Sequence, residues 1–203
     1  MYTDAEVYRS TEVLPRPDAE AWVAGPPMLD ARCGLAAAAH PDGKLYVAGG
    51  YGGSMIYHSS AEVLDPWCTT WTRLPPMRRS RTGMGLASGP DGCLYAVGGS
   101  PDGSHGHASA ERFDPRAGTW EALPPLILGR AYCSAAFGPS GRLYVVGGLS
   151  WPHGLIQTVE VFDPAAGRRV AMRGCSTLLP LLNWTYTLKP YGCMDPRGKR
   201  GSC

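Results

Sequence analysis

The sequence predicts an all-β protein built from repeated four-stranded units. Its 203 residues include 27 glycines and 19 prolines, roughly double the usual share of these two residues. Both are unfavourable inside helices, so many short strands joined by turns fit the composition better than a helical bundle. Hydrophobic residues make up 44% of the chain, which is enough apolar material for a core.

A period of 49 residues organises most of the chain, because several independent markers recur at this spacing. The first glycine of a Gly-Gly doublet, for example, lies at positions 49, 98 and 147. The markers are the Gly-Gly doublets Gly49 and Gly50, Gly98 and Gly99, and Gly147 and Gly148; the tryptophans Trp22, Trp71 and Trp120; the arginines Arg32, Arg81 and Arg130; and the Asp-Pro pairs that begin at Asp65, Asp114 and Asp163. Each period is therefore expected to be one structural unit.

The sequence pattern of each unit predicts four strands. The first is made of small residues, at 34–39, 83–88 and 134–137, and a Pro-Asp-Gly or Pro-Ser-Gly turn follows it. The second is a continuous apolar run such as Leu-Tyr-Val-Ala, which is typical of burial on both faces. The third ends at the Asp-Pro pair, since proline cannot donate to the ladder. The fourth carries the tryptophan.

This pattern resembles the kelch repeat over about residues 10–167. The shared features are the glycine doublet, an aromatic position before Asp-Pro, and a tryptophan at a fixed spacing behind it. The resemblance implies β-propeller blades, each a four-stranded antiparallel sheet with the small-residue strand innermost. It also implies that the doublets let backbones approach closely and that the tryptophans fill the space between blades.

The markers divide the chain into five segments. We expect the outer strands of a partial blade in 1–28, blades in 29–78 and 79–127, a blade lacking its outer strand in 128–167, and a non-repeat tail in 168–203. No marker recurs in the last segment, which holds seven basic residues and one acidic residue. We expect this tail to be foreign to the propeller and disordered, with a basic partner-binding tail as the alternative.

Composition and charge also indicate in which cellular compartment the protein acts and which classes of partner it lacks. No apolar run approaches the 18 or so residues of a membrane span, and the acidic first ten residues do not match a secretory signal. Seven cysteines without a Cys-x-x-Cys pair favour reduced thiols inside the cell. A net charge of +2 gives no indication of nucleic-acid binding. We expect a cytoplasmic protein with no membrane or nucleic-acid partner.

Signals for catalysis and cofactors are weak. The glycine-rich stretch 49–53 lacks the spacing of a nucleotide-binding loop, and His105 and His107, close to Asp102 in a polar loop, are a poor metal site. No Ser-His-Asp or Cys-His arrangement is evident. Three glutamates recur once per repeat, which indicates scaffold: Glu62, Glu111 and Glu160. We expect no enzyme, cofactor or metal; a kelch-fold oxidase or sugar epimerase is the alternative that the resemblance implies.

The loops between the second and third strands vary from unit to unit while the strands do not. They span 51–60, 100–108 and 149–157. Aromatic and polar residues on loops held by a rigid scaffold are typical of recognition surfaces; ordinary surface is the alternative. The candidate partner-binding residues are Tyr51, Tyr57, His58, Asp102, His105, His107, Trp151 and His153.

Arg32, Arg81 and Arg130 are the remaining candidates for partner binding. Each precedes an innermost strand, so the repeat places them on one face, and the resemblance implies that this face binds substrate. Because guanidinium groups grip carboxylates, we expect an acidic peptide segment as the partner. The alternative is that each arginine pairs with a local acid.

These observations together predict non-catalytic protein–protein recognition. The resemblance implies substrate recognition for a ubiquitin-ligase adaptor, and the alternative is a truncated or non-functional product of a larger kelch gene. Closed propellers have typically four to eight blades, and three cannot close a ring. We therefore expect a fragment of a larger gene product, an open arc, or half of a six-bladed homodimer that completes the ring.

Overall fold

The computed structural model describes residues 7–67, 69–151 and 153–172. Every regular element among these residues is a strand, and the described part of the chain holds no helix that could cross a membrane. The prediction of an all-β chain of four-stranded blades is confirmed. Most of the predicted tail, from residue 173 onward, lies outside the described residues.

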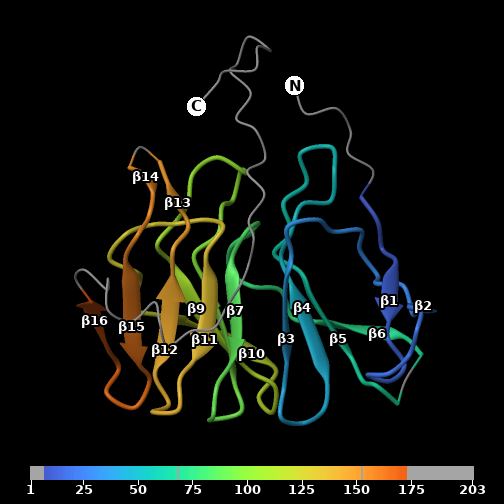
Figure 1. Ribbon diagram of the computed structural model, residues 1–203. Helices are drawn as coiled ribbons and strands as arrows, with labels where there is room; N and C mark the ends of the chain where they lie inside the picture. The colour runs from blue at the N-terminus through green and yellow to red at the C-terminus, as the bar shows by residue number, and fades with distance from the viewer. Residues whose placement is uncertain (1–6, 68, 152, 173–203) are drawn as a thin grey trace. The chain divides into compact units, whose positions relative to one another are not determined.

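Three four-stranded antiparallel sheets follow one another along the chain (Figure 1). The first blade comprises β3 (Ala36–Ala39), β4 (Leu45–Ala48), β5 (Ala61–Leu64) and β6 (Trp71–Leu74). The second comprises β7 (Gly85–Ser88), β8 (Leu94–Val97), β9 (Ala110–Asp114) and β10 (Thr119–Leu123). The third comprises β11 (Ser134–Phe137), β12 (Leu143–Val146), β15 (Val159–Asp163) and β16 (Arg168–Met172).

Two smaller sheets complete the described strands. β1 (Thr11–Val13) and β2 (Val23–Gly25) form the partial blade that the sequence predicts before the first blade. β13 (Leu149–Ser150) and β14 (Gly154–Leu155) form a short hairpin inside the loop between β12 and β15.

The third blade has its outer strand, which corrects the boundary predicted at residue 167. β16 pairs with β15 in register from Val159 to Asp163. The turn between them has Gly167 at φ +61°, matching Gly118 at φ +65° in the second blade, a backbone conformation that suits glycine. Strand pairing uses backbone groups and this turn, so it does not require the tryptophan that is missing from the third repeat.

Consecutive blades pack face to face through apolar side chains. Tyr46 and Ala48 of the first blade are buried together with Leu86 of the second. One repeat later, Tyr95 and Val97 are buried together with side chains of the third blade. The same positions of each unit therefore form each interface, which is why they recur at the repeat spacing.

The glycine doublets join neighbouring blades through the backbone. Gly50 N–H donates to the carbonyl oxygen of Arg81 at 2.7 Å, and Gly99 N–H donates to that of Arg130 at 2.8 Å. A Cβ on Gly49 would overlap the Arg81 carbonyl, and Gly49 has φ +69°. Only glycine allows both the approach and the conformation, which confirms the role predicted for the doublets of the first two blades.

The tryptophans confirm their predicted position in two of three repeats. Trp71 and Trp120 are buried, and their indole N–H groups donate to the carbonyl oxygens of Pro26 at 2.8 Å and Pro75 at 2.9 Å in the preceding unit. Trp22 is 64% exposed, so its prediction as an interblade residue is wrong. The described residues contain no earlier proline pair that could cover it.

We expect Trp71→Ala to destabilise the protein by about 3–5 kcal/mol, since it removes a large buried ring and its hydrogen bond. Trp22→Ala is the matched control and should cost less than about 1 kcal/mol, because an exposed ring loses little packing. Urea unfolding of both variants measures the two free energies. Similar losses for both would contradict the packing described above.

Candidate functional site

The three variable loops lie at the same end of their blades. Isolated backbone bridges join the start of each loop to the segment that enters the innermost strand of the same blade: Cys33 with Tyr51, Thr82 with Ser100, and Ala131 with Leu149. The loops at 51–60, 100–108 and 149–157 rise on one side in Figure 1. We call these three loops, with the adjoining residue Tyr132, the loop face.

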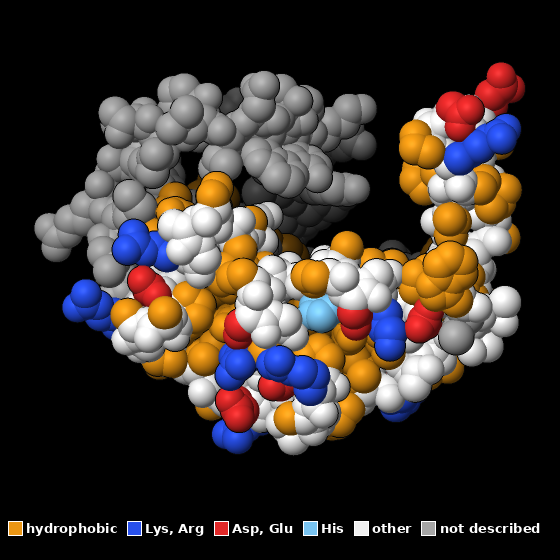
Figure 2. Space-filling view, turned by 90° about the horizontal axis from the view of Figure 1, so that it is seen from below, with side chains coloured by type: hydrophobic (Ala, Val, Ile, Leu, Met, Phe, Trp, Pro, Cys, Tyr) orange, Lys and Arg blue, Asp and Glu red, His pale blue; other side chains and the backbone are white. Residues whose placement is uncertain are grey.

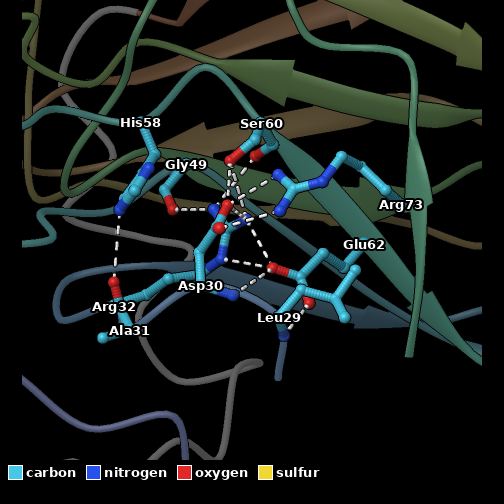
Figure 3. A network of polar contacts seen from close by, with 9 residues as sticks. All are labelled: Leu29, Asp30, Ala31, Arg32, Gly49, His58, Ser60, Glu62 and Arg73. Carbon is cyan, nitrogen blue, oxygen red and sulfur yellow. Dashed lines mark hydrogen bonds and ion pairs between the residues drawn. The ribbon is translucent and has the colours of Figure 1, made fainter. Parts of the chain in front are cut away.

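The three repeated arginines are buried and therefore form no part of an exposed binding surface. Arg32 is 4% exposed, and Arg81 and Arg130 are 0% exposed. Their guanidinium groups bind Glu62, Glu111 and Glu160, each at 2.7 Å. The prediction that they contact a partner is wrong, and the alternative of pairing with a local acid is what the structure shows. Figure 3 draws the network of the first blade.

Each ion pair is joined by further hydrogen bonds within its blade. In the first blade, Arg32 also donates to the carbonyl oxygens of Gly49 at 2.7 Å and Ser60 at 3.0 Å. Glu62 accepts the backbone N–H of Leu29 at 2.7 Å. Equivalent bonds recur in the other two blades. Each pair thereby ties the loop entering a blade to its second and third strands, and confirms the glutamates as scaffold.

Asp30 extends this network in the first blade alone. Its carboxylate accepts hydrogen bonds from both terminal nitrogens of Arg73 at 2.8 Å, and from Ser60 Oγ at 2.8 Å. The Arg73 hydrogen bonds, more than any other favourable contact, hold the pKa of Asp30 well below its usual range. The other repeats have Arg79 and Leu128 at this position, so this link from the entering loop to β6 is specific to the first blade.

His58 and His107 belong to the arginine network rather than to an exposed surface. His107 is half-buried, with Nδ1 at 3.0 Å from Ser109 Oγ and 3.4 Å from Arg81. Burial, and then the charge of Arg81, lowers the pKa of His107 to about 4, so the ring is neutral at pH 7. His58 contacts the Ala31 carbonyl at 3.2 Å. The two histidines are one repeat apart, a signal of a structural role that could have been recognised.

In the first loop, the two tyrosines predicted to bind a partner make contacts within the loop itself. The rings of Tyr51 and Tyr57 lie 5.1 Å apart, and Tyr51 Oη accepts the N–H of Met55 at 3.3 Å. Ser54 and Met55 have positive φ values of 48° and 64°, a strained conformation for such residues. The large apolar side chains that this loop presents to solvent are Met55 and Ile56, neither of which was among the candidates predicted from the sequence.

In the second loop, Asp102 organises the backbone. It accepts the N–H groups of Ser104 and His105, each at 2.9 Å, and its second oxygen lies 3.0 Å from His105 Nδ1. The bond from the His105 backbone is the main cause of an Asp102 pKa well below its usual range. Both side chains remain exposed, but they satisfy each other. Among the described residues there is no cluster of three metal-ligating side chains.

The third loop presents the most apolar surface. The β13–β14 hairpin pairs Leu149 with Leu155 and carries Trp151 at its tip, where Trp151, His153 and Leu155 are exposed. The predicted placement of Trp151 and His153 on the surface is confirmed. Beside the hairpin, Tyr132 is exposed and has φ +55°, at a position where the two preceding repeats have glycine.

The loop face is thus apolar and aromatic rather than cationic. Its exposed large apolar side chains are Met55, Ile56, Tyr132, Leu149, Trp151 and Leu155, and the repeated arginines are buried. Aromatic residues and methionine are enriched at protein interfaces, and loops held by a rigid scaffold often carry binding residues. This chemistry suits an apolar segment better than the acidic peptide expected from the arginines.

Comparisons with known proteins give one family and one fold. A family model described as the kelch motif matches residues 32–78 and 85–127. Among solved structures, the one titled "Structure of YjhT" is similar with a TM-score of 0.64 and 15% identity, covering 77% of this chain and 50% of that chain. The chain therefore spans about half the length of that structure, and the likeness concerns the fold. No curated protein matches the sequence.

We expect Arg81→Ala to destabilise the protein by about 3–5 kcal/mol, because it leaves the Glu111 carboxylate buried without its partner. The double variant Arg81→Met with Glu111→Leu should cost less than the two single changes together, since it removes both charges. Denaturant unfolding of the three variants provides the measurement. A stable Arg81→Ala protein would mean that the arginine is not part of the scaffold.

Proposed function

We propose that this chain, which belongs to the kelch-repeat family, is a non-catalytic protein-recognition module that binds its partner through the loop face. Kelch repeats generally mediate protein–protein interaction. The observation that carries the proposal is the group of exposed apolar side chains on loops whose bases are held by buried ion pairs. Such a surface loses little conformational entropy on binding, because its scaffold is already ordered.

The contacts of the loop face support binding rather than catalysis. Asp102 and His105 hydrogen-bond to each other and to their own loop, and His107 is engaged with Arg81 and Ser109. Groups occupied in this way are poorly suited to general acid–base work on a substrate. The partner segment that we propose is uncharged and apolar, and it would contact the hairpin that carries Trp151.

We extend the proposal to the setting in which such a module acts. The family resemblance supports substrate recognition for a ubiquitin-ligase adaptor in the cytoplasm. In that role the loop face would capture the substrate protein, while a separate domain or chain would supply the link to the ligase.

Peptide display against the intact protein tests the loop face. We expect the selected peptides to be rich in apolar and aromatic residues, and to bind the double variant Trp151→Ala, Leu155→Ser about tenfold more weakly, since anchor residues of an interface carry most of its affinity. Trp67→Ala is the matched control, because Trp67 is exposed on a turn at the opposite end of the first blade. Peptides that bind the double variant as well as the wild type would refute the proposal.

A second copy of this chain is a further partner that we propose. Leu45 is 38% exposed, whereas the equivalent residues Leu94 and Leu143 are each 1% exposed. In the third blade, Val146 is 40% exposed, whereas its equivalent in the second blade, Val97, is 2% exposed. These side chains occupy positions that a neighbouring blade covers elsewhere in the chain, and uncovered sheet surfaces favour association.

Light scattering measures this association directly. We expect a particle of twice the mass of one chain, and we expect Leu45→Glu combined with Val146→Glu to give monomers, since a charge cannot be buried unpaired in such an interface. A wild-type protein that stays monomeric and soluble at high concentration would exclude the homodimer while leaving the proposal for the loop face intact.

A further inference from the structure

A groove of about 490 Å³ lies between the second and third blades, at the end opposite the loop face. Figure 2 views the molecule from that side, where charged side chains alternate with apolar ones. The groove is within the usual size range of ligand sites. The lining residues that matter here are Tyr95, Arg112, Leu123, Pro124, Phe162 and Asp163.

The equivalent space between the first and second blades holds an indole ring. Trp120 lies against Phe113, with ring centroids 5.0 Å apart, and its N–H donates to the Pro75 carbonyl at 2.9 Å. It is buried in one cluster with Tyr46, and Leu74 packs against that cluster. The groove is built from the residues one repeat later, namely Phe162, Pro124, Tyr95 and Leu123.

The strand register shows which residue takes the place of this ring in the third repeat. Trp120 is paired with Phe113 across β9 and β10, and the corresponding partner of Phe162 across β15 and β16 is Arg169. The third repeat thus keeps the walls of a tryptophan pocket but has an arginine at the tryptophan position. Phe162 and Tyr95, which correspond to the neighbours of Trp120, are themselves well packed, at 7% and 1% exposed.

We propose that this groove binds the indole ring of a tryptophan presented by a partner protein. The ring lies against Phe162, and its N–H donates to the Pro124 carbonyl, as Trp120 does to Pro75 in the preceding blade. The wall carries Arg112 where the first blade has Val63. The guanidinium of Arg112 is held near Asp91 at 3.2 Å and Glu121 at 3.5 Å, and a fixed cation favours an electron-rich ring.

This site is independent of the proposed function, since it is at the other end of the blades and shares no residue with the loop face. Two Trp–Pro contacts in the same chain point to an indole as its occupant: Trp71 with Pro26 and Trp120 with Pro75. In both, an indole N–H meets the carbonyl of the first proline of a pair. Pro124 begins the third such pair.

Titration with N-acetyl-tryptophanamide, followed by NMR shifts of the Phe162 and Tyr95 rings, tests the groove in the intact protein. We expect saturable binding, and about fivefold weaker binding of the N1-methyl analogue, because that ring lacks the N–H donor. Absence of saturable binding at millimolar ligand would overturn the proposal, and so would equal affinity of the two ligands.

Arg169→Trp restores the residue of the preceding blades and should fill the groove from within the chain. We expect this variant to lose ligand binding and to melt at a higher temperature than the wild type. Arg168→Trp is the matched control, since neighbouring strand residues point to opposite faces, and it should change neither property. An Arg169→Trp protein that still binds the ligand would overturn the assignment of the pocket.

A third variant tests the groove even if Arg169→Trp fails to fold. Arg112→Val introduces the residue of the first blade and should weaken ligand binding about threefold, through loss of the cation; undiminished binding would contradict the role given to Arg112. If the wild-type protein self-associates and N-acetyl-tryptophanamide separates the copies, the ring comes from a second copy, which would overturn its assignment to a different protein.

Discussion

The buried arginine–glutamate pair of each blade is the interaction on which the rest of this structure depends. A buried charge is tolerated only when it is paired and its remaining hydrogen-bonding groups are satisfied. Arg81 is paired with Glu111, and its terminal nitrogen Nη1 also donates to the carbonyl oxygens of Gly98 and Ser109. The backbone carbonyl of the same arginine then accepts the N–H of Gly50 from the blade before it. One residue thus orders the loop that enters its own blade and joins that blade to its neighbour.

This arrangement divides the polar residues between scaffold and surface. Polar groups that recur at the repeat spacing form hydrogen bonds inside the blades. His107 is the clearest case, because burial, and then the charge of Arg81, lowers its pKa and keeps the ring neutral. The residues left for recognition are those that do not repeat, such as Met55 and Trp151 on the loop face. An apolar surface on a rigid base therefore follows from the way the charges are buried, and it favours an apolar partner over an acidic one.

Several departures from the repeat lie at the two sites that we propose for binding. Tyr132 has a positive φ at a position where Gly34 and Gly83 serve the other blades, so the chain accepts local strain to expose an aromatic ring. Arg169 replaces the tryptophan of the third repeat, and a groove lined by Pro124 and Phe162 lies where the earlier blade has its indole. A repeat protein offers its own internal comparison, because each unit shows what the next one would contain.

The spacing of residues by itself determined the blades, their strand order, the glycine doublets and the scaffold role of Glu111, because backbone pairing and local turns depend on neighbouring residues in the chain. Only the tertiary structure decided which members of a repeated set are buried. Trp22 and Trp71 are equivalent in sequence, yet one is exposed and the other is covered by Pro26. Likewise, Arg81 could have been on the surface until the position of Glu111 was known. Burial depends on what lies across space from a residue, and a one-dimensional period carries no information about that neighbour.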